Sequence, residues 1–417
     1  AGTSIEWYDF FLYGAAAALI FPTAFFGEMP PTTALLLSLL TFAAGFIARP
    51  IGGIVFGHFG DKVGRKKTLI SALMLMGVSS TLIGLLPTYA MIGVAAPILL
   101  TSLRFAQGLA IGGQWGGAML LVTESAPSNQ RGYYGAFAQA GAPIGVILAN
   151  LALIITSALV SEEFFNTWGW RIPFLASAVL ILISMYIQLN LEDTEAFKAL
   201  ANNKDTQSNK SIQKSPVIEA IRKYPKRIFL AAGAFLSVQV TFYILIAFML
   251  AYGVTSANMA RDDMLAAVLI ASAIMVPIQF VFSSYSDRHG RKGIFMLGAI
   301  LTAIWAFVIF PLVDTGNFYL IVLAISGGLI FLAMMYGPQA AFFTELFSTE
   351  VRYSGATLGY QFGAIVGGAF APTIAVKLWT EFDIIWVSAY IALASLLTLI
   401  SVMALTETYQ SDLNNTD

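Results

Sequence analysis

Cysteine is absent from this 417-residue chain, and histidine occurs only twice. The absence of cysteine excludes a disulfide framework and thiol chemistry, and with so few histidines it argues against a zinc or haem site. Charged residues make up only 11% of the chain, whereas hydrophobic residues make up 58%. A soluble protein of this length needs far more charge to stay dispersed. The composition therefore indicates a membrane protein, and a net charge of −1 gives no reason to expect nucleic acid as a partner.

Apolar stretches that are long enough to cross a lipid bilayer recur along the whole chain. The sequence predicts twelve of them, and therefore an all-α membrane protein with twelve transmembrane helices. The chain begins with Ala and no signal peptide precedes the first stretch, so we expect natural residues before Ala1 to be missing. The expected stretches cover residues 1–26, 33–56, 68–87, 92–123, 132–159, 168–189, 228–255, 264–285, 293–313, 318–343, 354–379 and 384–405.

A short motif, Asp-x-x-Gly-Arg-Lys, occurs twice in the chain. It begins at Asp61 between the second and third stretches and at Asp287 between the eighth and ninth, an offset of 226 residues. A Thr-Glu pair that precedes an arginine repeats with nearly the same offset, at Glu124 and Glu345. The repeat predicts two pseudo-symmetric bundles of six helices each, an arrangement typical of secondary transporters.

A long polar segment separates the two halves. We expect an N-terminal bundle over residues 1–190, a cytoplasmic linker over 191–227, a C-terminal bundle over 228–406 and a cytoplasmic tail over 407–417. Residues 216–226 are expected to form a short amphipathic helix at the membrane surface. Seventeen of the 22 Lys and Arg residues fall in connections on one side of the membrane. The positive-inside rule therefore places both termini in the cytoplasm.

The repeated loops carry fixed Asp and Gly positions as well as basic residues. Anchoring under the positive-inside rule explains the basic residues alone, so we favour a gating role at the cytoplasmic face. Gly64 and Gly290 are expected to permit tight turns with positive φ. When the cavity faces outward, the gating residues of the first half are expected to pair across closed helix ends. The predicted gating residues are Asp61, Arg65, Glu124 and Arg131 in the first half and Asp287, Arg291, Glu345 and Arg352 in the second.

The first copy of the motif resembles the loop signature of the major facilitator superfamily, Gly-x-x-x-Asp-x-x-Gly-Arg-Lys, and the second copy departs from it only where Ser283 replaces the first Gly. Other segments look like the metabolite:proton symporter branch, which includes transporters of shikimate, α-ketoglutarate, citrate and proline/betaine. The resemblance covers the whole chain and implies a monomer that drives uptake with protons across a bacterial inner membrane. Its residues are Gly57, Asp61, Gly64, Arg65 and Lys66 for the signature, and 6–10, 49–52, 104–108, 112–117, 168–174 and 345–355 for the branch.

Asp9 lies within the first stretch, and ionisable groups inside a membrane are costly and usually functional. Glu6 and Tyr13 lie three residues before it and four after it, so all three share one face of a helix. Asp9, or in its place Glu6, is the candidate for the group that takes up and releases the transported proton. The alternative is that Glu6 sits at the inner interface and Asp9 pairs structurally with an arginine.

Arg104 lies in the fourth stretch and is followed at helical spacing by Gln107 and Gln114. This polar stripe is expected to face a cavity, where the guanidinium can clamp an anionic substrate or hold Asp9 ionised until the substrate arrives. A purely structural pair of Arg104 and Asp9 is the alternative. Many members of the branch carry Glu at the position of Gln114, so this chain lacks that carboxylate. For Arg49 we favour a structural role, by snorkelling or in the inner gate.

The second half has polar and aromatic groups in place of intramembrane charges. Gln239 and Tyr243 share a face of the seventh stretch, and Tyr336 and Gln339 flank a proline in the tenth. In the major facilitator superfamily the first, fourth, seventh and tenth spans line the central cavity. The resemblance therefore implies that these four residues contact the substrate, although Tyr and Gln also bridge neighbouring helices.

The expected function is symport, in which protons and a small carboxylate-bearing metabolite, most simply an organic acid, enter together by alternating access. The rival is a proton-coupled antiporter that exports a drug or waste compound. A channel is disfavoured because no repeated filter segment is visible, and an enzyme because no nucleophile–base constellation is present. We expect no cofactor other than the coupling protons, no metal and no nucleic acid, and a monomer in the lipid bilayer of the inner membrane.

Overall fold

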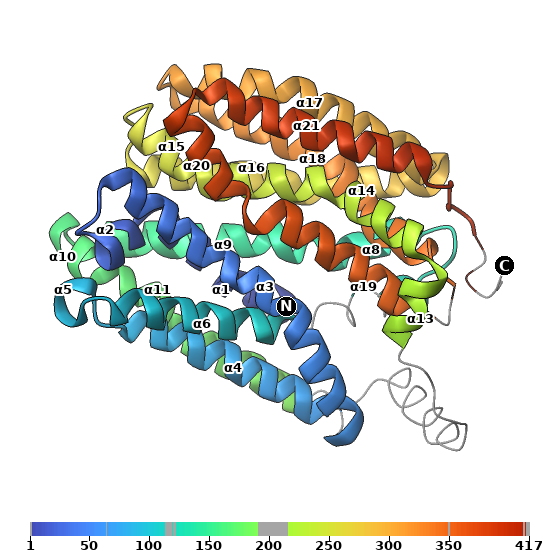
Figure 1. The fold of residues 1–417 in the computed structure, drawn as a ribbon, viewed down its shortest axis with the longest axis horizontal. Helices are drawn as coiled ribbons and strands as arrows, with labels where there is room; N and C mark the ends of the chain where they lie inside the picture. Colours follow the sequence, from blue (N-terminus) through green and yellow to red (C-terminus); the bar gives the residue numbers. More distant parts are fainter. Residues whose placement is uncertain are drawn as a thin grey trace.

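A computed structural model describes residues 2–63, 65–112, 119, 122–190, 216–348, 351–411 and 413. All regular elements in these ranges are helices, which confirms the all-α prediction. Most helices run along the long axis of the molecule, with the first half of the chain mainly in the lower part of Figure 1 and the second half mainly in the upper part.

The helices of the first half follow the predicted stretches, with shifted ends. The helix α3 extends beyond its apolar stretch into the polar residues at the start of the repeated motif. The elements are α1 (Gly2–Leu19), α2 (Phe21–Phe26), α3 (Pro31–Val63), α4 (Arg65–Leu85), α5 (Tyr89–Ile92), α6 (Ala95–Gly112), α8 (Arg131–Gln139), α9 (Gly141–Leu159), α10 (Glu162–Thr167), η1 (Gly169–Arg171) and α11 (Ile172–Asn190).

The second half begins with the predicted surface helix, α13 (Pro216–Lys223). Two of its spans contain a π-helical segment, η2 and η3. Such segments are mostly single turns within α-helices and are frequent at functional sites. The elements that follow α13 are α14 (Pro225–Tyr243), η2 (Ile244–Phe248), α15 (Met249–Thr255), α16 (Arg261–His289), α17 (Arg291–Asp314), α18 (Phe318–Glu345), α19 (Arg352–Gly363), η3 (Ala364–Ala369), α20 (Ala371–Glu381) and α21 (Ile384–Ala404).

Eleven helical segments of the described chain are long and apolar enough to cross a membrane. The remaining span is the first predicted one, formed by α1 with α2. It carries Glu6 and Asp9 and packs against α3, α9 and α11 inside the molecule. The fold is therefore the expected twelve-helix arrangement. The most polar span is also one of the most enclosed, so its charged residues face protein and not lipid.

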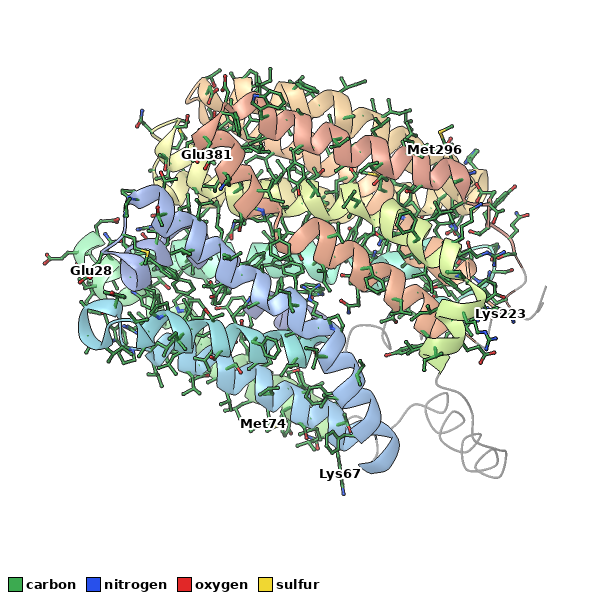
Figure 2. The ribbon with its side chains drawn as sticks, in the orientation of Figure 1. Glu28, Lys67, Met74, Lys223, Met296 and Glu381 are labelled. Carbon is green, nitrogen blue, oxygen red and sulfur yellow. The ribbon has the colours of Figure 1, made fainter. Side chains whose placement is uncertain are left out.

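The two ends of the helical bundles differ in charge. Lys67 and Lys223 lie at one end, and Glu28 and Glu381 lie at the other (Figure 2). We refer to the end with Lys67 and Lys223 as the basic end and to the opposite one as the acidic end. The positive-inside rule predicts that the basic end faces the cytoplasm.

Gly290 makes the turn between α16 and α17 with a φ of +100°, as predicted. The equivalent Gly64 lies outside the described residues. Asn317 and Asp383 start α18 and α21 by accepting hydrogen bonds from the first free backbone N–H groups. These caps fix where the helices enter the membrane at the acidic end.

Glycine lets α3 and α6 cross at very short range. A Cβ atom on Gly108 would lie 2.0 Å from the carbonyl oxygen of Gly45, and one on Gly112 would lie 1.9 Å from the carbonyl oxygen of Arg49. A Cβ on Gly45 would also lie 2.6 Å from Nε of Arg104. This close crossing through small residues therefore helps to set the positions of both arginines.

Gly108→Ala is expected to lower the melting temperature of the purified protein. Overpacking typically costs about 1–3 kcal/mol, and here the obstructing atom is backbone, which cannot rotate away. Gly293→Ala on α17 is the matched control, because nothing lies within 4 Å of its added Cβ. Gly293 lies in the first turn of α17, so alanine there should leave the stability unchanged or raise it by less than about 1 kcal/mol. Equal melting temperatures for the two variants would contradict the close crossing.

Candidate substrate site and gates

Aromatic rings from both halves meet at the centre of the molecule. Tyr243 of α14 inserts between rings of the first half, with centroid distances of 5.0 Å to Phe46 and 5.6 Å to Phe42. It also contacts Phe10 and Phe11 of α1. A cavity of about 20 Å³ lies beside it, lined among others by Trp7, Phe11, Gln239, Tyr243, Tyr336 and Tyr360. This central pocket has room for about one water molecule, so a metabolite can enter only if the aromatic walls separate.

Arg104 is completely buried next to this aromatic cluster. Its guanidinium carbon lies 3.8 Å from the ring centroid of Phe10, 4.5 Å from that of Tyr13 and 4.6 Å from that of Phe42. Nη1 donates to Gln107 Oε1 at 3.1 Å, Nε and Nη1 donate long hydrogen bonds of 3.4 and 3.5 Å to the carbonyl oxygens of Phe42 and Phe10, and Nη2 has no hydrogen-bond partner in the described chain. No carboxylate of the described residues lies within ion-pair distance. Arg104 is thus a buried cation that lacks a counter-ion.

Asp9 is 1% exposed and sits on the opposite side of a short polar network from Arg104. Ser177 of α11 donates to its Oδ1, and Ser80 of α4 also faces its carboxyl group. Ser80 in turn accepts a hydrogen bond of 2.8 Å from Gln107 Nε2. The network joins Asp9 to Arg104 through Ser80 and Gln107. The hypothesis of a direct pair between Asp9 and Arg104 is therefore wrong for this structure, because the carboxyl group points to α11 and the guanidinium into the aromatic cluster.

The remaining first-half candidates are placed as follows. Glu6 is half-buried one turn from Asp9. Tyr13 shares a hydrogen bond of 2.6 Å with Thr41 and presents its ring to Arg104. Gln114 lies outside the described residues.

Arg49 is buried more deeply than a snorkelling arginine would be. The snorkelling prediction is wrong, because the side chain is 1% exposed and reaches neither end of the molecule. Its guanidinium carbon lies 4.4 Å from the ring centroid of Phe46, 4.5 Å from Phe10 and 5.3 Å from Trp7. The sequence offered one signal of this, an arginine well inside an apolar stretch. It did not indicate that the arginine faces the same rings as Arg104.

All four predicted residues of the second half are buried near the centre. Gln239, Tyr243 and Tyr336 line the central pocket. Gln339 is buried with its Oε1 lacking a hydrogen-bond partner, and Gln239 has an unpartnered Nε2 within the described chain. The second half therefore offers neutral donors and acceptors at the centre. The guanidinium groups of Arg49 and Arg104 contact the neighbouring first-half rings and are not among the residues that line the pocket.

At the basic end, the second copy of the repeated motif forms a buried ion cluster. Arg291 Nη2 lies 2.9 Å from Glu345 Oε1, and Arg291 Nη1 lies 2.6 Å from Asp287 Oδ1. Asp287 also accepts hydrogen bonds of 2.7 and 2.8 Å from the backbone N–H groups of Gly132 and Tyr133. A carboxylate from the second half thus binds the N-terminus of α8 in the first half, where the helix dipole favours negative charge.

The repeated Glu and Arg residues pair crosswise between the halves. Arg131 Nη1 lies 3.7 Å from Glu345 Oε1, and Arg352 Nη1 lies 3.2 Å from Glu124 Oε1. Thr123 and Thr344, which precede the two glutamates, share a hydrogen bond of 3.1 Å. Glu124 and Arg131, which were expected to pair among the first-half gating residues, thus bind residues of the second half. The side chains of Asp61 and Arg65 lie outside the described part of the chain.

The segment after α21 crosses this cluster. Thr408 donates to Glu345 Oε2 at 2.8 Å, and the carbonyl oxygen of Ser411 accepts from Arg131. Partial burial alone would raise the pKa of the Glu407 carboxyl group. Hydrogen bonds from the backbone N–H groups of Lys292, Arg291, Tyr409 and Thr408 outweigh that effect and hold the pKa below its ordinary value. The ionised Glu407 thereby fastens this segment to the start of α17.

A second set of contacts joins the halves at the acidic end. Arg261 lies 3.1 Å from Glu162, and Asp262 accepts a hydrogen bond of 2.8 Å from Ser157. Deeper in the membrane, Asn150 of α9 donates to the carbonyl oxygen of Leu265 on α16. Contacts between the halves therefore bridge both ends of the molecule.

A family model described as Major Facilitator Superfamily matches residues 2–358. The chain belongs to the major facilitator superfamily. The inner membrane metabolite transport protein YhjE of Escherichia coli (strain K12) is 41% identical over 99% of this chain and 93% of its own length. The shikimate transporter of the same organism is 38% identical over 94% of this chain and 89% of its own length. The resemblance to metabolite transporters is thereby confirmed, and a transporter, not an enzyme, is the class of protein.

Solved structures of the major facilitator superfamily share the fold at much lower identity. The crystal structure of a D-xylose–proton symporter superposes with a TM-score of 0.73 at 17% identity, covering 99% of both chains. This likeness confirms the twelve-helix fold and carries no statement about substrate. The chain is accordingly a multi-pass membrane transporter of a small metabolite.

Proposed function

We propose that this transporter is a proton-coupled symporter that imports a small carboxylate-bearing metabolite by alternating access. The observation that carries the proposal is Arg104, a buried guanidinium among aromatic rings with no carboxylate partner in the described ranges. A buried charge without a counter-ion is strongly unfavourable. A substrate carboxylate supplies that counter-ion and matches the planar guanidinium with two parallel hydrogen bonds.

Proton coupling is proposed to act through Asp9. Loss of its proton places a negative charge at one end of the network that runs through Ser80 and Gln107 to Arg104. That charge competes with the substrate for the attraction of Arg104, whereas protonated Asp9 leaves the guanidinium free to bind. Proton and substrate anion therefore favour each other's binding, which is the requirement for symport. Glu6, one turn away, is the second candidate for the proton.

The charge of the site favours an anion over a betaine-like cation. Aromatic cages bind quaternary ammonium groups through the faces of their rings. Here guanidinium groups already cover the faces of Phe10, Phe42 and Phe46. Two buried positive charges would also repel an incoming ammonium group. This supports an organic acid as the substrate, with no cofactor other than protons.

The two sets of bridging contacts support alternating access. Opening the basic end requires the cluster around Glu345 to separate, and opening the acidic end requires Arg261 to leave Glu162. The central pocket then opens to one side at a time. We place the basic end in the cytoplasm and the protein in the inner membrane as a monomer.

Arg104→Gln is expected to weaken carboxylate binding strongly. The loss of a charge-assisted pair costs about 1.5–3 kcal/mol, or roughly 10- to 150-fold in affinity. Thermal-shift titrations with small carboxylates, in detergent and at acid and neutral pH, measure this. Arg171→Gln is the control, because Arg171 is a buried arginine near the acidic end whose guanidinium donates to backbone carbonyl groups.

Uptake into proteoliposomes then tests the direction of coupling. A symporter accumulates the carboxylate when the outside is more acidic than the inside. Accumulation only when the inside is more acidic would identify the rival exporter. Binding of carboxylates that Arg104→Gln leaves unchanged would contradict the proposed site.

A further inference from the structure

Arg49 is a second buried cation, and its surroundings differ from those of a structural arginine. No nitrogen of its guanidinium donates to a carboxylate or to a backbone carbonyl oxygen of the described residues, and its polar neighbours are the hydroxyl groups of Tyr243 and Tyr360. Arg171, by contrast, donates to the carbonyl oxygens of Gly84 and Leu86. Structural arginines in apolar surroundings are satisfied in that way, because unpaired buried donors are costly. The lack of an anionic or carbonyl partner for Arg49 therefore points to a ligand and not to a role in packing.

The backbone of Arg49 is held in place by the crossing of α3 and α6. Its carbonyl oxygen lies so near Gly112 that a Cβ there would be 1.9 Å away. From this fixed position the side chain extends to the rings of Trp7, Phe10 and Phe46. The hydroxyl groups of Tyr243 and Tyr360 also face its guanidinium.

Arg49 and Arg104 belong to one site. Both guanidinium groups contact the ring of Phe10, at 4.5 and 3.8 Å from its centroid. The sum of these distances, about 8.3 Å, is the upper limit of the separation between the two guanidinium carbons. Tyr243 and Tyr360, which face Arg49, line the central pocket. A ligand bound to Arg104 in an opened pocket therefore has Arg49 within reach of a short carbon skeleton.

We propose that Arg49 is a second anion-binding residue, and that the transported metabolite carries two anionic groups joined by a short skeleton. This inference rests on the proposed function, which it narrows from carboxylates in general to small dicarboxylates. One carboxylate neutralises one of the two cations and leaves the other unpaired. A second carboxylate supplies the missing counter-ion, and the Tyr243 and Tyr360 hydroxyl groups can donate to its remaining lone pairs. Arg104 and Arg49 then set both the charge and the length of the substrate.

Matched pairs of ligands test the inference on the unaltered protein. The probes are malonate, succinate and glutarate, each compared with its monoamide, which keeps the skeleton and replaces one carboxylate by a neutral group. Both carboxylates of the diacids are ionised at pH 7.5. For at least one length, the diacid should bind at least about tenfold more tightly than its monoamide, since a charge-assisted bond is exchanged for a neutral one. Monoamides that bind as tightly as all three diacids would overturn the inference.

Variants of Arg49 test whether this residue causes the preference for the diacid over its monoamide. Arg49→Gln is expected to bind the diacid and its monoamide with nearly equal affinity, with the affinity for the monoamide close to that of the unaltered protein. Arg49→Lys keeps the charge without the bidentate geometry, so it should retain part of the preference. A full preference for the diacid in Arg49→Gln would refute the role of Arg49. If Arg49→Gln does not fold, Arg49→Lys decides, because an unchanged preference would show that guanidinium geometry plays no part.

The failure of this inference can be told apart from that of the proposed function. If neither diacids nor monoamides bind to the unaltered protein, carboxylate transport itself is wrong and the inference fails with it. If both series bind equally and binding depends on Arg104, the proposed function stands and only the second anion site is rejected. Arg171→Gln, with its buried arginine outside the site, should keep the preference of the unaltered protein.

Discussion

Asp9→Asn is expected to lose proton-driven accumulation of substrate while it still exchanges substrate across the membrane. Asparagine fills the same volume and can accept the hydrogen bond that Ser177 donates to Asp9. It carries no charge in either state, so the polar network toward Arg104 no longer responds to protons. Binding and the change between inward and outward forms can continue, because Asparagine resembles the protonated carboxyl group.

Proteoliposomes separate the two activities. With the membrane potential held at zero, a gradient of one pH unit can support about tenfold accumulation for each coupled proton, since about 1.4 kcal/mol corresponds to a factor of ten. The unaltered protein should reach that level, and Asp9→Asn should reach a ratio of about one. Counterflow of labelled substrate should persist in both. If Asp9→Asn accumulates substrate to a ratio clearly above one, Asp9 is not the coupling group.

Glu6→Gln identifies which of the two carboxyl groups carries the proton. Asp9 is fully buried and joined to Arg104 through the network, whereas Glu6 is half-buried. We therefore expect Glu6→Gln to retain accumulation. The reverse result, with loss in Glu6→Gln and retention in Asp9→Asn, would transfer the coupling role to Glu6.

The helices were predictable because the bilayer sets their length and the positive-inside rule sets their alternation. Their ends were less predictable, since α3 continues to Val63 and α14 starts at Pro225 on polar residues that a hydropathy window excludes. The π-helical segments η2 and η3 carry no signal in the sequence. Gly368 at η3 packs against the ring of Tyr243, the residue just before η2, so tertiary contacts accompany both segments.

The site was predictable in its residue types and less so in its contacts. Arg104 and Asp9 stood out because charge inside an apolar stretch is rare. The surroundings of Asp9 and its indirect link to Arg104 depend on Ser80 and Ser177 from two other helices. Serine is too common in membrane helices for the sequence to mark these two as part of the site. Arg49 was misjudged because its position near Pro50 suggested the inner end of a span. Only the crossing of α3 and α6 brings it to the rings that Arg104 contacts.

The repeat predicted which residues form the gate but not how they pair. An offset of 221 residues makes Glu124 the counterpart of Glu345. Two-fold symmetry alone is satisfied by pairs within each half or by pairs between halves. The structure has both kinds of pair, since Glu345 binds Arg131 of the other half and Arg291 of its own. The two glutamates differ in exposure: the side chain of Glu345 is 0% exposed, and that of Glu124 is 46% exposed. Among the described residues, Glu345 also binds Arg291 and Thr408.

Glu345→Gln is therefore expected to shift the protein strongly toward the form that is open at the basic end. Glu345 is the shared anion of Arg291 and Arg131. Removing one partner of a buried ion pair costs about 3–5 kcal/mol. That cost falls on the closed form, because opening lets water reach the two arginines. A change of 3 kcal/mol corresponds to more than about a hundredfold in a two-state equilibrium.

Single-cysteine labelling measures the shift without background, since the chain contains no cysteine. Ala340→Cys is the reporter for the basic end, because Ala340 is buried on α18 against Gly135 of α8. Leu265→Cys reports on the acidic end, where its backbone is bound by Asn150. In the Glu345→Gln background, a thiol-specific reagent should modify Ala340→Cys much faster and Leu265→Cys no faster. Equal acceleration at both positions would indicate general loosening of the fold.

Glu124→Gln provides the matched control for this gate. It removes the symmetry-related carboxylate, but from an exposed position where an ion pair contributes only about 0–1 kcal/mol. The labelling rate at Ala340→Cys should therefore change less than about fivefold. If the two variants accelerate labelling equally, the gate is held by charge at both copies of the repeat. If only Glu345→Gln does so, the closed state depends on the buried cluster, and the exposed copy of the repeat contributes little to holding the basic end shut.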